Sequence, residues 1–250
     1  IAFIDSDAYP RADWLNNAVR YFDNDEIVAV GGPGLTPESD NLAQKASGEI
    51  LASLIGSWRF RSRHQPSSLT ECDDLPTANL LVRRAAFLQV KGFDPTYWTG
   101  EDTEFCLRIV RVLNKKMLYA PDVVVYHHRR PVFRDHLRQI SRYGLHRGYF
   151  ARKFPETSRR PIYFAPSVLT LIMLGGLPLA VLSSYAAFLY LAGIFTYFFM
   201  CALVGANSAL KAHSLKMFGM VVLGTVLTHV SYGLHFLKGL LSRSLSDSRP

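Results

Sequence analysis

The apolar residues of this chain are distributed in two different ways along its length. Up to Pro161 they come in short runs broken by charges, which is typical of a water-soluble domain that mixes strands and helices. Residues 162–182 and 185–206 then contain no Asp, Glu, Lys or Arg, and each approaches the roughly 20 apolar residues that a helix needs to cross a bilayer. Residues 217–237 form a third uncharged stretch, diluted by two histidines. The pattern therefore predicts two membrane spans and leaves open whether a third follows.

Shorter-range patterning in the first part of the chain predicts an alternation of strands and helices. A helix opened by Pro10 and ending near residue 22 would carry an apolar face made of Trp14, Leu15, Val19 and Phe22. The other predicted elements are strands at 1–4, 27–30, 78–82 and 123–126, helices at 41–60, 85–90, 101–113 and 132–154, and a polar loop at 61–74.

This alternation predicts an α/β fold with a mostly parallel sheet flanked by helices on both faces. We expect the folded domain to cover residues 1–160 and the membrane region residues 161–250. Because the chain begins in the middle of a predicted buried strand, we also expect that strands preceding residue 1 are missing from it. Ligands of such sheets lie beyond the carboxyl ends of the strands, so polar residues at these ends are the candidates for ligand contacts.

The net charge of +8 is concentrated just before the first hydrophobic stretch. By the positive-inside tendency this side is cytoplasmic, and the charges also suit anionic lipid headgroups or substrate phosphates. Nucleic-acid binding is disfavoured, because no nucleic-acid motif accompanies the charge. The ten basic residues are Arg129, Arg130, Arg134, Arg138, Arg142, Arg147, Arg152, Lys153, Arg159 and Arg160.

Charges after the hydrophobic stretches test this orientation. Lys211 and Lys216 follow two crossings and return to the cytoplasmic side. Lys238, Arg243 and Arg249 would fall on the opposite side if the third stretch crossed the membrane. The alternative is that the third stretch lies in the membrane interface.

Asp5-Ser6-Asp7 places two carboxylates two residues apart, directly after the first predicted strand. One of them can reach a divalent metal while the other faces a ribose or the waters of the metal. Hard oxygen ligands of this kind suit Mg²⁺ or Mn²⁺, which can neutralise a leaving pyrophosphate. Taken alone, the triplet is more typical of a polar turn before a helix.

Thr99-Gly100-Glu101-Asp102 opens a predicted helix and has two interpretations. Thr99 with a carboxylate three residues later fits a capping box. Alternatively, Asp102 is a general base, because the positive end of a helix stabilises the ionised carboxylate that accepts a proton.

Two further groups of residues could contact a ligand. His127-His128 ends a predicted strand and could supply a metal ligand, for which we take His127, or could be a solvated pair. Gln139, Arg142 and Tyr143 share one helix face, where they could contact an acceptor hydroxyl, a phosphate and a sugar ring. The same spacing is typical of an amphipathic helix near a membrane.

The order of these motifs resembles the family 2 glycosyltransferases, which are inverting enzymes with a GT-A-type fold. The resemblance rests on Asp-X-Asp after a strand, Gly-Glu-Asp at a helix start, and Gln-X-X-Arg-aromatic on a helix that leads into hydrophobic spans. It covers roughly residues 1–143. Residues 77–84, followed by Gly92-Phe93-Asp94, are similar to the acceptor-side region of the family, which implies an acceptor contact for Asn79.

The resemblance implies a transfer of sugar from a nucleotide-diphosphate donor to a saccharide or a polyprenyl-linked acceptor, as in polysaccharide biosynthesis. It implies that Asp5 faces the nucleotide, that Asp7 binds the divalent metal, and that Asp102 is the catalytic base with Glu101 beside it. Gln139, Arg142 and Tyr143 would lie on the helix that closes over donor and acceptor. The expected protein is a multi-pass membrane enzyme with its catalytic domain on the cytoplasmic face.

Two departures from the family pattern and two rival functions remain. Tyr143 stands where the family usually has Trp, which argues against a processive synthase of the cellulose type. In the family, the strands that hold the nucleotide base precede the Asp-X-Asp, and we expect that this chain lacks them. A membrane-anchored binding or regulatory module without catalysis is the first rival. A transport subunit is disfavoured, because the first two spans offer few polar residues.

Overall fold

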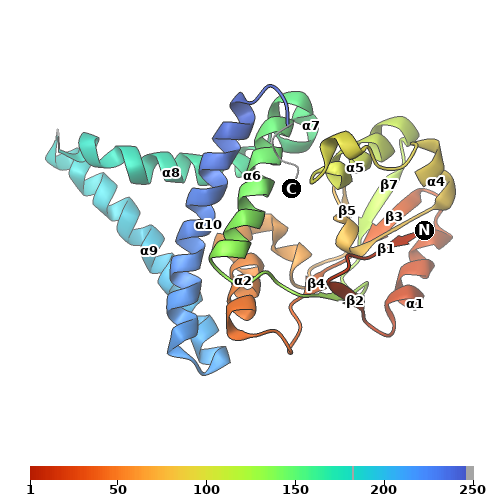
Figure 1. The fold of residues 1–250 in the computed structure, drawn as a ribbon, viewed down its shortest axis with the longest axis horizontal. Coiled ribbons are helices and arrows are strands. Elements are labelled where there is room, and N and C mark those ends of the chain that lie inside the picture. The colour runs from red at the N-terminus through yellow and green to blue at the C-terminus, as the bar shows by residue number, and fades with distance from the viewer. Residues whose placement is uncertain (182, 246–250) are drawn as a thin grey trace. The chain divides into compact units, whose positions relative to one another are not determined.

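The computed structural model describes residues 1–181 and 183–245, and its chain divides into two compact units. Among the described residues, the first unit consists of residues 1–40 and 59–129, and the second of residues 41–58 and the chain from 130 to 245. Residues 41–58 and 130–160 belong to the unit that contains the apolar helices. Figure 1 shows the elements of both units with their labels.

Two small sheets form the framework of the first unit. Five strands lie in the order β1 (Ala2–Phe3), β6 (Leu80–Val82), β3 (Ile27–Gly31), β7 (Lys116–Tyr119) and β5 (Thr70–Cys72). Three more lie in the order β2 (Ala8–Pro10), β8 (Val125–His127) and β4 (Gly34–Leu35). Among the strands that the structure describes, the pairs β3–β7 and β4–β8 are parallel and the others antiparallel. The predicted α/β class is confirmed, whereas the pairing is mixed rather than mostly parallel.

Helices cover both faces of the five-stranded sheet, as predicted. On one face, α4 (Arg84–Gln89) and α5 (Glu101–Leu113) bury Phe105 and Ile109 against Leu80 and Val82. On the other, α1 (Trp14–Val19) packs Trp14 and Ala18 against Leu81. The alternation of Leu80, Leu81 and Val82 between the two cores is the period of two that a strand imposes.

The amino-terminal elements differ from the prediction in three respects. Pro10 lies in strand β2, and the helix begins only at Trp14. Leu15 and Val19 are exposed, because Trp14 and Ala18, four residues apart, form the buried stripe instead. Strand β1 is half exposed at the end of the sheet in the described residues, so it is not the buried strand that its apolar composition predicted.

The second unit consists of helices, and the single helix predicted at 41–60 is interrupted in the structure. Its first part ends before Ser53, whose hydroxyl accepts a hydrogen bond from the amide of Gly56 and so caps a second helix. The helices are α2 (Leu42–Ala52), α3 (Leu54–Ser57), α6 (Arg134–Lys153), α7 (Pro155–Ser158), α8 (Pro161–Ala180), α9 (Ser184–Ala212) and α10 (Leu215–Leu241). Short 3₁₀ helices occur at Arg20–Asp23, Trp58–Arg63, Thr77–Asn79 and Pro95–Tyr97.

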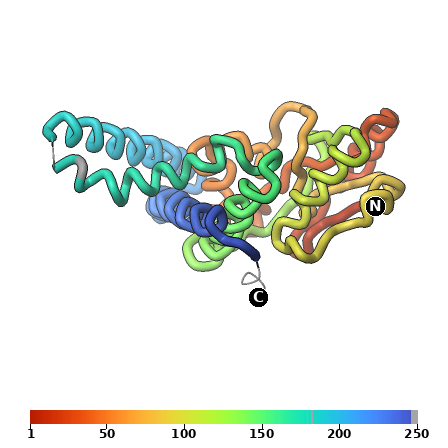
Figure 2. The backbone as a smooth tube through the Cα atoms, turned by 90° about the horizontal axis from the view of Figure 1, so that it is seen from above, coloured from red at the N-terminus to blue at the C-terminus, as the bar shows by residue number. Residues whose placement is uncertain are grey.

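Three of these helices, α8, α9 and α10, are long and apolar enough to cross a membrane. They coincide along the sequence with the three predicted hydrophobic stretches. Figures 1 and 2 show that α8 and α9 meet at one end and diverge from it, whereas α6 runs beside α10.

Helices α6 and α10 approach each other closely along a glycine seam formed by Gly144, Gly148 and Gly239. A Cβ atom on Gly148 would come within 2.0 Å of the carbonyl oxygen of Phe236, and one on Gly239 within 2.0 Å of that of Leu145. Glycine at these positions therefore lets the two backbones touch. The same small-residue packing joins helices inside membranes.

Candidate functional site

Asp5 and Asp7 lie in a turn that connects strand β1 of one sheet to strand β2 of the other. The amide of Ala8 donates a hydrogen bond to the carbonyl of Asp5, which closes the turn. Strand β2 then pairs with β8, with Ala8 opposite His127, and the amide of His128 donates to the carbonyl of Asp7. The backbone thus holds the Asp-X-Asp turn and the end of β8 together.

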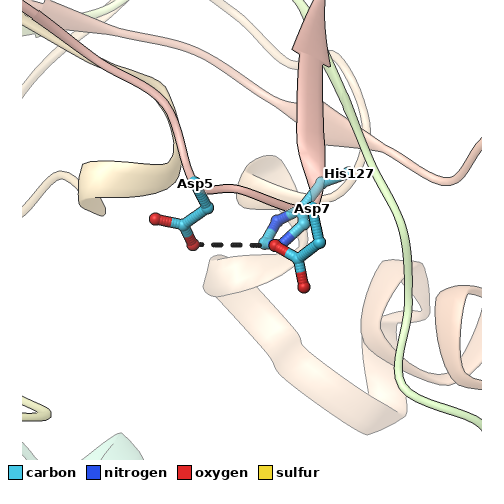
Figure 3. Close-up of side chains that lie close together, drawn as sticks. All are labelled: Asp5, Asp7 and His127. Carbon is cyan, nitrogen blue, oxygen red and sulfur yellow. Dashed lines mark hydrogen bonds and ion pairs between the residues drawn. The ribbon is translucent and has the colours of Figure 1, made fainter.

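The side chains of Asp5, Asp7 and His127 converge, as Figure 3 shows. The Nε2 atom of His127 lies 3.1 Å from a carboxylate oxygen of Asp7 and 3.9 Å from one of Asp5. One ligand atom from each residue lies within 4.8 Å of the other two, which is close enough for all three to reach one metal ion. The two predicted metal ligands, Asp7 and His127, are therefore adjacent, and Asp5, which was predicted to face the nucleotide, lies beside them.

The surroundings of His127 favour its neutral form. Burial lowers the pKa of the imidazole, the charge of Arg129 lowers it further, and Asp7 and Asp5 act in the opposite direction. A neutral imidazole keeps a lone pair free for a metal, so the residue is suited to be a ligand near neutral pH.

His128 points elsewhere, into a buried cluster that the sequence did not reveal. Its Nδ1 atom lies 2.5 Å from a carboxylate oxygen of Asp40, and the other oxygen of Asp40 accepts the amide of Arg129. Asp40 is almost wholly buried, and Arg129 is buried by contacts with Gly34 and Thr36. Arg129 is therefore part of the interior and not of an exposed basic surface.

Helix α5 brings Glu101 and Asp102 into the first unit. Its N-cap is Gly100, so Thr99 stands one residue before the N-cap position that the capping box assigned to it. Asp102 accepts a hydrogen bond of 2.7 Å from the amide of Thr103, in the first turn of the helix. The hydroxyl of Thr103 lies 3.2 Å from Asp74, which is paired with Arg63 at 3.0 Å.

Glu101 has the more unusual environment of the two carboxylates. Burial raises its pKa, and the negative charge of Asp5 raises it further. Its Oε2 atom is buried and has no hydrogen-bond partner among the residues that the structure describes. Glu101 is therefore coupled electrostatically to the Asp5–Asp7 turn and poised to hold a proton or to meet a ligand.

The other residues predicted for the site do not belong to the group of Asp5, Asp7 and His127. Asn79 is buried, where its side chain accepts from the indole of Trp14 and donates to the carbonyl of Val123 at 2.7 Å and that of Pro33 at 3.4 Å. These bonds use its amide fully, so the predicted acceptor contact finds no support in them. Gln139, Arg142 and Tyr143 lie on α6 in the second unit, where Gln139 donates to the hydroxyl of Tyr143 at 2.9 Å.

Comparison with known proteins gives two findings. The family model described as glycosyl transferase family group 2 matches residues 1–234. The chain is 29% identical over 156 residues to the pre-mycofactocin glycosyltransferases of two Mycobacterium tuberculosis strains, CDC 1551 / Oshkosh and ATCC 25618 / H37Rv. The match covers 62% of this chain and 32% of each relative, so the chain spans about a third of their length.

Proposed function

This chain belongs to glycosyl transferase family group 2, and we propose that it moves a sugar from a nucleotide-diphosphate donor to a saccharide or lipid-linked acceptor, with inversion. The observation that carries the proposal is the convergence of Asp5, Asp7 and His127, with Glu101 coupled to the same turn. Clustered carboxylates of this kind suit a reaction in which a phosphorylated leaving group departs.

Asp5, Asp7 and His127 would together hold a divalent metal. Two carboxylates and an imidazole suit Mn²⁺ better than Mg²⁺, because Mg²⁺ prefers oxygen ligands and several waters. When bound there, the ion would offset the negative charge of the donor pyrophosphate. Asp7, the less exposed carboxylate and the nearer to His127, is the principal ligand, and Asp5 faces the nucleotide.

Asp102 would serve as the general base. Its place in the first turn of α5 stabilises the ionised carboxylate, and the amide of Thr103 orients it. An acceptor hydroxyl that gives its proton to Asp102 would attack the anomeric carbon from the face opposite the nucleoside diphosphate, and one such displacement inverts the centre. Glu101, with its raised pKa, is suited to donate a hydrogen bond beside it.

Helix α6 would contribute the remaining contacts. Arg142 supplies a guanidinium for the pyrophosphate, and Tyr143, with 45% of its surface exposed, supplies a ring for the sugar. The hydrogen bond between Gln139 and Tyr143 keeps both side chains on one face, where Gln139 can meet an acceptor hydroxyl. The basic residues of this helix support a location on the cytoplasmic face of the membrane.

The test is turnover of a panel of nucleotide sugars, measured as release of nucleoside diphosphate. Acceptors are oligosaccharides, polyprenyl-phosphate sugars and pre-mycofactocin, which the names of the relatives indicate. Asp102→Asn should lower kcat by about 10²–10⁴-fold while donor affinity changes little. The control is Asp25→Asn, because that carboxylate is 97% exposed.

Two results would contradict the proposal in different ways. Near-normal turnover by Asp102→Asn would remove the residue from the role of base while leaving glycosyl transfer intact. Binding of donor without turnover by the unsubstituted protein would favour the alternative, a membrane-anchored binding module.

A further inference from the structure

Asp102 is held by the residue that follows it on helix α5. The Oδ1 atom of Asp102 accepts a hydrogen bond of 2.7 Å from the amide of Thr103 and lies 3.4 Å from the hydroxyl of the same residue. Thr103 is only 3% exposed, so its hydroxyl depends on protein groups for its partners. We propose that, in the glycosyl transfer on which this inference rests, Thr103 is a positioning residue for Asp102, and that Asp74 and Arg63 hold the hydroxyl of Thr103 in place.

The hydroxyl of Thr103 bridges two carboxylates. It lies 3.2 Å from Oδ1 of Asp74 on one side and 3.4 Å from Oδ1 of Asp102 on the other. A hydroxyl has a single proton to donate, so two ionised carboxylates compete for it. A change in the charge of Asp74 therefore changes how firmly the hydroxyl holds Asp102.

Arg63 offsets the charge of Asp74. Its guanidinium lies 3.0 Å from Oδ2 of Asp74 and donates to the carbonyl oxygen of the same residue at 3.4 Å. The two side chains are 24% and 11% exposed, so water screens their attraction little. Without Arg63, the uncompensated carboxylate of Asp74 would draw the hydroxyl of Thr103 away from Asp102.

The backbone beside Asp74 is also attached to α5. The amide of Leu75 donates to the Sγ atom of Cys106 at 3.5 Å, and that thiol lies 3.6 Å from the carbonyl oxygen of Leu75. Burial raises the pKa of Cys106, and the negative charges of Asp74 and Asp102 raise it further, so the thiol remains a neutral donor. Cys106 lies three residues after Thr103, on the same face of the helix. Asp74 therefore cannot leave Thr103 without breaking this attachment.

Arg63 is fixed from its own side. The ring of Phe60 lies 5.3 Å from the centre of the guanidinium, and the hydroxyl of Tyr119 on β7 donates to the carbonyl of Gln65 at 3.2 Å. Arg63 and Asp74 stand near the two ends of the segment 61–74, for which the sequence predicted only a polar loop. Their ion pair closes this segment against α5 and completes a chain of contacts that ends at Asp102.

These contacts divide the work between the two oxygens of Asp102. An oxygen that accepts two hydrogen bonds is the weaker base, so Oδ1 is held by Thr103 while Oδ2 takes the proton of the acceptor hydroxyl. The acceptor oxygen then bonds to the anomeric carbon, and the bond from that carbon to the diphosphate breaks with its electron pair. A carboxylate that rotates freely is less often aligned for this step. Loss of the hydroxyl should therefore lower kcat and leave donor binding unchanged.

Thr103→Val tests this expectation, because it removes the hydroxyl and keeps the branched shape. Turnover is the release of nucleoside diphosphate by the full chain in detergent, with the most reactive nucleotide sugar of the panel. We expect kcat to fall by about 10-fold with an unchanged KM for the donor, and Thr103→Ser to restore most of the loss. Ile109→Val, a buried change on the same helix, should lower the unfolding temperature but retain kcat.

The same substitution in an Asp102→Asn background separates positioning from a structural role. With no base to orient, Thr103→Val should lower kcat little further. Equal fold-losses in both backgrounds would overturn the positioning role and leave Asp102 as the base. Near-normal turnover by Asp102→Asn alone would overturn the base assignment, and the role of Thr103 with it.

Arg63→Met tests the second link in the chain of contacts. It removes the guanidinium and keeps the length of the side chain, so kcat should fall in the unsubstituted protein but much less in Thr103→Val, where the hydroxyl is already absent. Arg61→Met is the matched control, because Arg61 is exposed in the same segment. A loss that is undiminished in Thr103→Val would overturn the role of the ion pair.

A further measurement needs no substrate. The unfolding temperatures of Thr103→Val, Asp102→Ala and the double variant should not be additive, because each single change removes one partner of the same hydrogen bond. Additive shifts would show that the hydroxyl and the carboxylate do not interact, and would overturn the inference whatever the protein transfers.

Discussion

At the residue scale, the two carboxylates of the Asp5–Asp7 turn have different surroundings. The side chain of Asp7 is 26% exposed and close to His127, whereas that of Asp5 is 44% exposed and farther from the imidazole. Asp7 and His127 therefore form the fixed part of the candidate metal site, and Asp5 is the member more accessible to a ligand.

Substitution of Asp7 should weaken metal binding. We expect Asp7→Asn to lower the affinity for Mn²⁺ by at least about 10-fold, because it removes a charged ligand while keeping the shape of the side chain. Titration calorimetry with Mn²⁺ measures the change. Asp25→Asn serves as the control, and an affinity equal to that of the unsubstituted protein would exclude Asp7 as a ligand.

Neighbouring residues show what the sequence could reveal of the site. The proximity of Asp5, Asp7 and His127 was predictable, because each lies at or just after the end of a strand and ligands gather at strand ends. The cluster of Asp40 with His128 was not, because Asp40 comes from a loop with no pattern of its own. Local spacing placed the N-cap of this helix at Thr99, whereas the structure has it one residue later, at Gly100.

At the scale of elements, the contact of α6 with α10 requires glycine at several positions, because the two backbones touch there. The glycine seam leaves no room for a side chain, and it binds the helix that carries Gln139, Arg142 and Tyr143 to an apolar helix. The position of these three side chains therefore depends on α10.

A methyl group in this seam should destabilise the protein. Gly148→Ala should lower the free energy of unfolding by about 1–3 kcal/mol, because the new Cβ atom would overlap the carbonyl of Phe236. Gly219→Ala is the matched control, since a Cβ atom there has nothing within 4 Å, and it should stabilise α10 by up to about 1 kcal/mol. Unfolding in detergent, followed by fluorescence, measures both, and equal effects would contradict the close packing.

The same contact should make stability depend on pH through His136. Burial lowers the pKa of this imidazole to about 4, below the usual value near 6.5. Between these values the unfolded chain binds more protons, so stability is complete above about pH 6.5 and falls as the pH falls toward 4, by at most about 3 kcal/mol.

Unfolding temperatures between pH 7.5 and 5 test the assignment to His136. His136→Leu should be less stable at pH 7.5, since it loses the bond to Thr228, but should show a flatter pH profile. His213→Asn, at an exposed position, should retain the profile of the unsubstituted protein. An unaltered profile in His136→Leu would assign the dependence to other groups.

Helices and strands were predicted well where a local sequence pattern determines them, and poorly where contacts between distant segments determine their bounds or existence. Helix α5 was predicted with its observed bounds, because its apolar spacing is regular. The helix at 41–60 was predicted too long, because the break at Ser53 depends on a single hydroxyl. Strand β7 was missed, since Lys116–Tyr119 gains its order from pairing with β3 and β5.

At the scale of the whole molecule, the change in composition near residue 160 predicted where the helices that are long and apolar enough to cross a membrane begin. It did not predict the two compact units, because α2 and α6 have polar surfaces and yet pack with apolar helices through a few small and aliphatic residues. The mixed strand pairing likewise depends on contacts between distant segments.

The chain should behave as an integral membrane protein. We expect it to stay in the membrane pellet after extraction with alkaline carbonate and to be released by detergent, because helices α8 and α9 expose a continuous apolar surface. Immunoblotting of pellet and supernatant measures this, with a known peripheral protein as the control. Release by carbonate alone would show that these helices do not insert.

The glycine seam limits how this protein can be shortened for biochemical work. A fragment ending near residue 160 would keep α6 but lose α10, and would present the buried His136 and the bare backbone of Gly144 and Gly148 to water. Such a fragment is expected to aggregate even though its strands are intact. Shortened versions would have to retain α10, by joining the end of α7 to the start of α10 with a flexible linker.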